Sequence, residues 1–204
     1  MTEQEFLKTK QHRIENVDDA IDSLCGLWDY FDDYEENGIR YSDVDVLITH
    51  VLDSTAFREA PGAASRHHAY AGGLLVHTAQ VTFTMLDMLR SMENARLLEA
   101  TVAAVWHDFG KIWDYEFACD EYTKTPHCYK INHVARSYSE FNKVALDLCP
   151  AIDVDFVGHL ILSHHGRKEW GSPVEPQCVE AWALHAADML SAQFIRNEVE
   201  YAYE

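Results

Sequence analysis

In this chain, Trp106-His107-Asp108-Phe109-Gly110-Lys111 places two ionisable side chains directly after a run of apolar residues. Residues 97–105 before it alternate leucine and valine with alanine and predict a helix in the core. We expect Gly110 to stop this helix in the left-handed conformation that glycine adopts easily. His107 and Asp108 then lie at the exit of a core helix, where an imidazole and a carboxylate are costly unless they are paired or bound to a metal ion.

Length and composition are those of an ordinary globular protein. The chain has 204 residues, of which 48% are hydrophobic and 25% are charged, enough for one well-packed domain. We expect a single domain over residues 1–204, with residues 1–43 forming an N-terminal helical extension that packs on the rest. No apolar run approaches the roughly 20 residues that span a bilayer, and residues 1–16 lack a signal-peptide core. The sequence therefore predicts a cytoplasmic protein that does not enter the membrane.

The formal net charge of -18 argues against strong non-specific binding to nucleic acid, whose affinity for proteins comes mainly from Lys and Arg on phosphates. It leaves open a nucleotide, or a short single-stranded 3' end that enters a pocket with its own cations. The acidic residues cluster early and predict a solvated acidic face: Asp18, Asp19, Asp22, Asp29, Asp32, Asp33, Glu35, Glu36, Asp43 and Asp45.

The five cysteines are an odd number and have no Cys-x-x-Cys spacing. This argues against a disulfide framework and against a thiolate zinc site. We expect Cys25, Cys119, Cys128, Cys149 and Cys178 to be thiols of the core.

The apolar spacing along the chain predicts an all-α fold. The expected helices cover residues 14–34, 44–52, 74–92, 97–105, 132–148, 153–165 and 176–199. Asp153 is a favourable N-cap, and Pro176 suits the first turn of the last helix. Residues 114–130 show no helical period, so we expect an irregular insertion or a small β-hairpin there.

The chain is rich in histidine, and several histidines combine with aspartates into a candidate ligand set. The set consists of His77, His107, Asp108, His133, His164, His165 and Asp188. No two of them form a local His-x-x-x-His pair, so a metal site must be assembled by the fold. The alternative is that they are core histidines whose ring nitrogens are satisfied by hydrogen bonds.

Four further motifs occur in order along the chain. They are Arg66-His67-His68-Ala69-Tyr70-Ala71-Gly72-Gly73-Leu74-Leu75-Val76-His77-Thr78, Ser163-His164-His165-Gly166, Gly171-Ser172-Pro173 and the isolated Asp188. Together with His107-Asp108-Phe109-Gly110-Lys111 they resemble the HD-domain metal-dependent phosphohydrolases. Within that superfamily, the chain is most similar to the HD domain of the YhaM-type 3'-5' exoribonucleases. The likeness covers roughly residues 44–194, which is most of the chain.

The resemblance implies an HD-domain helical bundle that holds two divalent transition-metal ions. His77, His107, Asp108 and Asp188 match the set that would hold the first ion. His133, His164 and His165 match the extra histidines of two-metal HD enzymes and would hold the second, with Asp108 as the bridge. Imidazole and carboxylate ligands without thiolates suit Mn, Fe, Ni, Co or Zn, and we favour Mn or Fe.

The resemblance also implies roles in catalysis for His107, Asp108 and Lys111. Two such ions would activate a hydroxide for attack on phosphorus, and Lys111 would pair with a phosphate oxygen. Arg66, Arg167, Lys168 and Tyr70 are further candidates for substrate binding.

Other aromatic and histidine residues have weaker assignments. Tyr70, Trp113 and Tyr115 either stack on a base or belong to the core. His67 and His68 either line the pocket or order the loop before His77, and His185 either orients a ligand or packs in its helix. We expect His12, His50, His127 and His159 to be structural or surface residues.

Three hypotheses for function follow. The first is a metal-dependent phosphodiesterase or 3'-5' exonuclease acting on short single-stranded nucleic acid, which the subgroup motifs favour. The second is a nucleotide phosphohydrolase acting on nucleoside mono- or triphosphates or cyclic nucleotides. The net negative charge favours this second hypothesis. So does our expectation that this chain has no OB-fold, since YhaM-type enzymes carry one at the N-terminus to help hold RNA. The third is a non-catalytic nucleotide-sensing module, which the complete ligand set disfavours. The sequence leaves the oligomeric state open.

Overall fold

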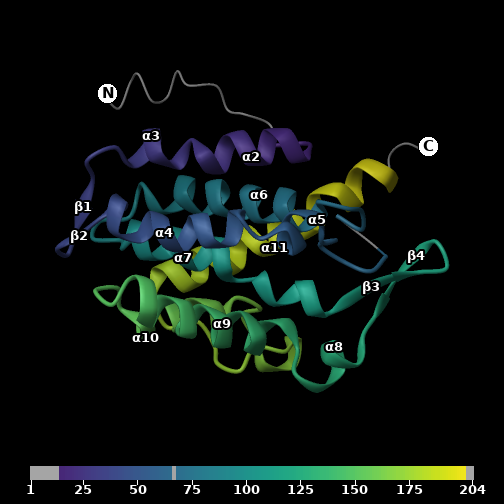
Figure 1. Cartoon of the computed structure of the whole chain (residues 1–204). Coiled ribbons are helices and arrows are strands. Elements are labelled where there is room, and N and C mark those ends of the chain that lie inside the picture. Colours follow the sequence, from purple (N-terminus) through teal and green to yellow (C-terminus); the bar gives the residue numbers. More distant parts are fainter. Residues whose placement is uncertain (1–13, 66–67, 201–204) are drawn as a thin grey trace.

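The computed structural model describes residues 14–65 and 68–200, with side chains described up to residue 193. Helices dominate these residues (Figure 1), which confirms the prediction of an all-α fold. The helices are α2 (Val17–Cys25), α3 (Leu27–Phe31), α4 (Tyr41–Leu52), α5 (Thr55–Glu59), α6 (Gly73–Leu89), α7 (Leu97–Trp106), α8 (Pro126–Lys130), α9 (His133–Leu148), α10 (Val154–Ser163) and α11 (Val179–Glu200). Short 3-10 helices, η1 (Phe109–Trp113) and η2 (Lys168–Trp170), follow α7 and α10.

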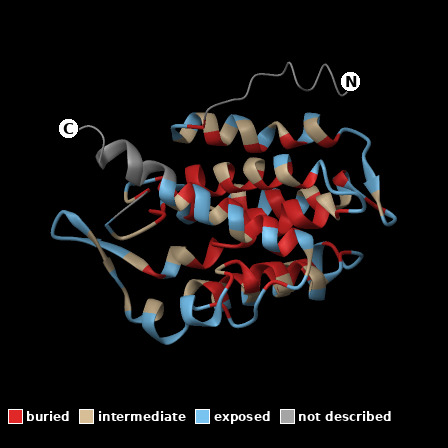
Figure 2. Cartoon of the chain, turned by 180° about the vertical axis from the view of Figure 1, so that it is seen from behind, coloured by how far each residue is buried: buried red, intermediate tan, exposed pale blue. Residues whose placement is uncertain are grey.

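The helices α6 and α7 form the centre of the molecule. The helix α6 packs against α2, α5, α7 and α11, and α7 packs against α4, α6, α9, α10 and α11. In Figure 1, α2 and α3 lie along one side of this centre, while α9 and α10 lie along the opposite side. Every residue of α7 from Leu98 to Trp106 is buried, and Figure 2 shows the buried residues concentrated in the middle layers. The two residues that follow α7, His107 and Asp108, therefore lie buried in the interior.

Carboxylates accept hydrogen bonds from the backbone amides at the starts of two helices. The predicted N-cap Asp153 accepts a hydrogen bond from the Phe156 amide at 3.0 Å, which confirms its role. Glu36 reaches from the N-terminal hairpin to the start of α7, where its two carboxylate oxygens accept from the Leu97 and Leu98 amides at 3.0 and 3.2 Å. None of the ten clustered acidic residues is buried, as the prediction of a solvated face required.

The predicted helix over residues 14–34 is wrong in its length, because it is interrupted at Gly26. Glycine is a poor helix former, and here it joins α2 to the short α3. The chain then leaves α3 at Asp32, which has a φ of 41°, so that Phe31 stacks on Tyr41 with ring centroids 5.2 Å apart. Two short strands, β1 (Glu35–Glu36) and β2 (Ile39–Arg40), follow and were not predicted.

The last helix begins at Val179, three residues later than predicted, so Pro176 lies before it rather than in its first turn. The Gln177 amide donates to the imidazole Nε2 of His159 on α10 at 3.1 Å. This hydrogen bond holds the segment before α11 against α10, and the first turn of α11 starts only beyond it.

The predicted left-handed conformation of Gly110 is also wrong, because Gly110 has no positive φ and lies inside η1. What requires glycine here is a close approach between two segments of backbone. A Cβ added at Gly110 would lie 2.3 Å from the carbonyl oxygen of His133 and 2.8 Å from its Cα. Gly110 therefore allows η1 to contact the first residue of α9.

The predicted insertion around residues 114–130 is a β-hairpin followed by the short α8. Strand β3 (Tyr115–Ala118) pairs in antiparallel fashion with β4 (Glu121–Lys124), and Tyr115 faces Lys124 in the register. Cys119 and Asp120 form the turn with φ values of 54° and 65°. The hairpin projects from the helical body (Figure 1).

All five cysteines are free thiols, in agreement with the predicted absence of a disulfide framework. Their expected place in the core is correct for Cys149 and wrong for Cys25 and Cys119, which are exposed. The reason is that Cys25 lies on the outward face of α2 and Cys119 lies at the hairpin turn.

The buried apolar residues form one cluster that runs from Ile14 to Ala187. The helix α2 packs on α6, and residues 1–13 lie outside the described part. The N-terminal extension over residues 1–43 stays a prediction. The single-domain organisation of residues 1–204 stays a prediction. Across the described ranges, no helix has both the length and the apolar character needed to cross a membrane.

Candidate metal centre

The fold brings all seven predicted ligands together from five separate places in the chain. His77 lies in the second turn of α6, His107 and Asp108 follow α7, His133 begins α9, His164 and His165 follow α10, and Asp188 lies on α11. They form two groups, in each of which the potential ligand atoms lie within 4.8 Å of one another. The first group is His77, His107, Asp108 and Asp188, and the second is His133, His164 and His165. These are the same two sets that the sequence resemblance implies.

In the first group, imidazole nitrogens and carboxylate oxygens converge on one small volume. The Nε2 atom of His77 lies 3.3 Å from Asp108 Oδ2 and 3.2 Å from Asp188 Oδ1. The Nε2 atom of His107 lies 3.3 Å from the same oxygen of Asp108 and 3.3 Å from the Nε2 of His77. Two imidazoles and two carboxylates that aim at a common point are a typical arrangement for a divalent cation.

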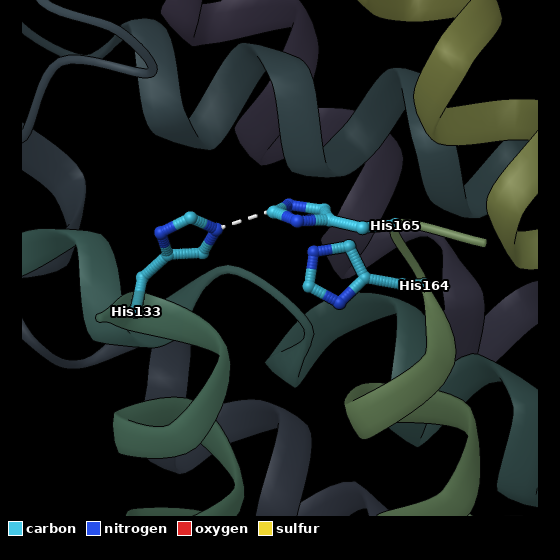
Figure 3. A group of neighbouring side chains, drawn as sticks. All are labelled: His133, His164 and His165. Carbon is cyan, nitrogen blue, oxygen red and sulfur yellow. Dashed lines mark hydrogen bonds between the residues drawn. The ribbon is translucent and has the colours of Figure 1, made fainter. Parts of the chain in front are cut away.

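In the second group, three imidazoles face one another (Figure 3). His133 at the start of α9 points toward His164 and His165, which leave the end of α10, and the Nε2 atoms of His133 and His165 lie 3.2 Å apart. Asp108 connects the two groups with different oxygens. Its Oδ2 faces the first group, while its Oδ1 lies 3.5 Å from His133 Nε2 and 3.7 Å from His164 Nε2.

Each of the five histidines in these groups has its other ring nitrogen occupied by an oxygen acceptor. The acceptors are the Ser191 hydroxyl for His77 (2.9 Å), the Ala104 carbonyl for His107 (2.7 Å), the Asp114 carboxylate for His133 (3.0 Å), the Ile161 carbonyl for His164 (2.7 Å) and the Trp170 carbonyl for His165 (3.0 Å). An acceptor at Nδ1 keeps the proton of a neutral imidazole on that atom. The lone pair of Nε2 is then available to a metal ion, which is how protein scaffolds orient histidine ligands.

The electrostatic surroundings favour neutral imidazoles in the second group. Burial, with a smaller contribution from the neighbouring His133, lowers the pKa of His165 to about 4. Burial likewise holds the pKa of His164 well below its usual range, and His165 and His107 add to this effect. Both rings therefore keep their Nε2 lone pairs at neutral pH.

The carboxylates of the first group attract positive charge. Burial opposes ionisation of Asp108, but the Lys111 ammonium and His107 outweigh it and hold the pKa of Asp108 well below its usual range. Burial also lowers the pKa of His77, whereas its hydrogen bonds to Asp108 and Asp188 raise it, and the net direction is upward.

Two buried polar atoms provide an independent test of whether this site fits a metal. Asp108 Oδ1 and His164 Nε2 are both buried and have no hydrogen-bond partner among the described residues. Such atoms are costly to bury unless another group satisfies them. Because both atoms face the space between the two groups, and because the ligand set is nitrogen and oxygen without sulfur, the residues fit divalent transition-metal ions.

Lys111 lies beside the first group, close to its predicted place. Its Nζ is 2.5 Å from Asp108 Oδ2, and its side chain is only 12% exposed. Burial lowers the pKa of Lys111, but Asp108 outweighs this and raises it, so the pair is ionised. The ammonium reduces the net negative charge of the carboxylates around it.

The other predicted substrate contacts are spread around the site. Arg167 and Lys168 are exposed at η2, and Tyr70 is 40% exposed. His68 is buried with a φ of 57°, and its ring centroid lies 5.3 Å from that of His77. Arg66, His67 and His12 lie outside the described residues.

The remaining histidines have structural contacts. His185 donates from Nδ1 to the His164 carbonyl at 2.8 Å, so it supports the backbone of a ligand. His50 stacks on Trp106, with ring centroids 5.7 Å apart, and His159 accepts from the Gln177 amide. Of the aromatic candidates, Trp113 lies under the Arg136 guanidinium at 5.2 Å, and Tyr115 is half-buried.

Sequence reasoning missed two residues that support the second group, Asp114 and His127. Asp114 is fully buried, and it accepts from His133 Nδ1 at 3.0 Å and from His127 Nδ1 at 2.7 Å. The Nε2 of His127 in turn accepts from the Arg136 guanidinium at 3.2 Å. The one sequence signal was the position of Asp114 three residues after Lys111, in a turn that leaves a buried helix.

The all-α fold and the two histidine- and aspartate-rich groups at its centre define a metal-dependent phosphohydrolase domain of the HD type. The family model of the HD domain matches residues 74–193, and the chain belongs to this family. A relative is the 3'-5' exoribonuclease YhaM of Bacillus velezensis, which is 33% identical over 143 residues, covering 68% of this chain and 44% of the relative. The chain thus spans less than half of that relative's length. No solved structure matches it.

Replacing Asp114 with Asn should weaken metal binding at the second group by about 10- to 100-fold, the usual cost of losing an outer-sphere partner of a ligand. An amide has only one oxygen for two histidine donors, so its NH₂ group would face either His133 or His127. A donor opposite Nδ1 of His133 moves that ring's proton to Nε2 and removes the lone pair from the site. Calorimetric titration of the metal-free variant with Mn²⁺ measures the change.

Asp120→Asn, at the exposed hairpin turn, is the matched control and should bind metal like the wild type. Equal affinities in Asp114→Asn and the wild type would show that Asp114 does not orient His133.

Proposed function

We propose that this chain is a metal-dependent phosphodiesterase that removes nucleotides from the 3' end of short single-stranded nucleic acid. The observation that carries the proposal is the pair of ligand groups joined by the two oxygens of Asp108. A site with room for two cations around one carboxylate suits the transfer of a phosphoryl group. Support for the direction of cleavage comes from the relative, which is named a 3'-5' exoribonuclease.

The residues of the chain prepare the site in two ways, and the metal ions would add a third contribution. His107, Asp108 and His164 are buried, so hydrogen bonds and charges there act in a medium of low polarity. Lys111 offsets the negative charge of Asp108 next to where a phosphate would bind. Two divalent ions, for which we favour Mn or Fe, would lower the pKa of a water molecule and neutralise charge on the phosphoryl oxygens.

A second candidate function is the hydrolysis of nucleotides, either nucleoside mono- or triphosphates or cyclic nucleotides. The net charge of -18 favours it, because a small substrate does not need an extended basic surface. The same metal centre would serve either substrate, so the residues around the centre would decide whether nucleic acid or a nucleotide binds. A cytoplasmic location stays a prediction.

A substrate panel tests the proposal. The protein is stripped with a chelator, reloaded with Mn²⁺ or Fe²⁺, and assayed on bis-p-nitrophenyl phosphate, on 5'-labelled single-stranded RNA and DNA, on cyclic nucleotides and on nucleoside mono- and triphosphates. We expect a ladder of products shortened from the 3' end that appears only with metal. Blocking the 3' hydroxyl should slow the reaction.

Turnover of mononucleotides alone would replace the proposal by the second candidate. Metal binding without turnover of any substrate would overturn both and favour a nucleotide-sensing module.

A further inference from the structure

An exposed aromatic cluster borders the second ligand group. It consists of Trp170 at the end of η2, Trp182 and His185 on α11, and the Arg167 side chain, and we call it the tryptophan platform. Trp170 and Trp182 are 50% and 55% exposed, which is unusual for large apolar side chains. Each indole centroid lies 6.0 Å from that of His185, and the Arg167 guanidinium lies 5.0 Å from the Trp170 ring.

The centre of the platform is rigid. The Nδ1 of His185 bonds to the His164 carbonyl, and the His185 ring packs flat on Gly166, where an added Cβ would lie 2.5 Å from the ring. Gly166 has a φ of 81°, so glycine both allows the turn after α10 and makes room for the imidazole. Both indoles thus contact a fixed ring while about half of each side chain stays in solvent.

The platform lies on the open side of the metal centre. His77, His107, Asp108 and His164 are buried, whereas His133, His165 and Asp188 are partly exposed, so a substrate would enter past these three. The backbone carbonyl of Trp170 accepts a hydrogen bond from Nδ1 of His165 at 3.0 Å. Trp182, His185 and Asp188 follow one another at intervals of three residues on α11, which places them on neighbouring surfaces of the helix, from the exposed indole to the ligand.

We propose that the tryptophan platform binds the nucleobase of the nucleotide whose phosphate lies at the metal centre. This inference rests on the proposed function and identifies what recognises its substrate. Indole surfaces stack on any base, and this gives affinity without sequence selectivity. The Arg167 guanidinium adds a positive charge beside the stacking surface of a strongly acidic chain, where it would attract the nucleotide.

The platform is a better stacking surface than the aromatic residues singled out from the sequence. Trp113 is 37% exposed, and it already contacts Phe109, His127 and the Arg136 guanidinium. Tyr70 lies on the loop before α6, where its ring centroid is 6.3 Å from that of the buried His68. Trp170 and Trp182, which are 50% and 55% exposed, therefore offer more aromatic surface to a ligand than Trp113 does.

Binding and kinetics of Trp170→Ala and Trp182→Ala test the inference. Trp28→Ala is the matched control, because Trp28 is also 50% exposed but lies on α3, which runs along the side of the helical body away from α9 and α10 (Figure 1). Affinity is measured by fluorescence anisotropy with a 5'-labelled oligonucleotide whose last linkage is a slowly cleaved phosphorothioate. Its 3' residue is either a normal nucleotide or an abasic one. Metal content is measured for every variant, since Trp170 also supports His165.

We expect each platform variant to weaken binding of the normal 3' end by about tenfold, the usual contribution of one stacked base, and to raise KM more than it lowers kcat. The abasic 3' end should bind the wild type and Trp182→Ala equally. An unchanged affinity of Trp182→Ala for the normal 3' end, with oligonucleotide cleavage intact in the wild type, would overturn the platform and leave the proposed function standing. Base-dependent binding to the platform without cleavage of nucleic acid would support the platform and overturn the proposed function. If the platform variants lose affinity for a mononucleotide but not for the oligonucleotide, the platform stands and the substrate is the small one.

Discussion

Asp108→Asn should reduce phosphodiester hydrolysis by roughly a thousandfold or more, because a bound metal ion contributes several kcal/mol of charge stabilisation in the transition state. Asp108 is the one described residue whose carboxylate faces both ligand groups. Asparagine has nearly the same size but no charge, and its NH₂ group would point either at the Lys111 ammonium or at the imidazoles of the second group. Metal binding should fall at both groups rather than at one.

Turnover of bis-p-nitrophenyl phosphate and metal content after dialysis measure these effects, and circular dichroism shows whether the variant is folded. Asp29→Asn, on the exposed face of α3, is the control and should match the wild type. A folded Asp108→Asn protein that retains both ions and a tenth or so of the turnover would contradict the bridging role assigned here.

Gly110→Ala should destabilise the fold by about 3 kcal/mol, at the upper end of what overpacking in a core costs. The added methyl group would meet the His133 carbonyl oxygen at 2.3 Å and its Cα at 2.8 Å, and both are backbone atoms that cannot rotate away. The start of α9 must then move away from η1. Because His133 is the residue that moves, the second group should lose metal affinity more than the first.

Thermal unfolding of the metal-free protein measures the loss of stability, and a shift of Tm by roughly 5–10 °C is expected for a chain of this size. Gly26→Ala is the control, since Gly26 has a φ of -69° and a new Cβ there would lie 3.2 Å from two carbonyl oxygens rather than in collision with them. A Tm for Gly110→Ala that equals that of Gly26→Ala would mean that α9 accommodates the methyl group without cost.

Much of the fold and of the candidate ligand set follows from the sequence, because both depend on local patterns. The 3.6-residue repeat of apolar side chains predicts helices such as α7 and α9, whose observed bounds differ from the prediction by a residue or so. The ligand set followed from the resemblance to the HD family, since residue type and spacing alone left open that these were core histidines with satisfied ring nitrogens. Where prediction failed at Pro176, the outcome depended on a contact with another element, the hydrogen bond from Gln177 to His159. At Gly26 the helix is interrupted by a residue that is itself a poor helix former.

Sequence alone thus determined that the chain is helical and which family it belongs to, because both are recorded in residue type and spacing. It also predicted which side chains would carry ligand atoms. Only the tertiary structure decided which atoms meet. Three examples are the hydrogen bonds of Asp114 with His133 and His127, the contact between Gly110 and α9, and the hydrogen bond between His165 and Trp170. Each joins residues that tertiary packing brings together. Hydrogen bonds and close contacts require atoms to lie within a few ångströms of each other. A single sequence does not indicate which distant residue the packing of helices brings that close.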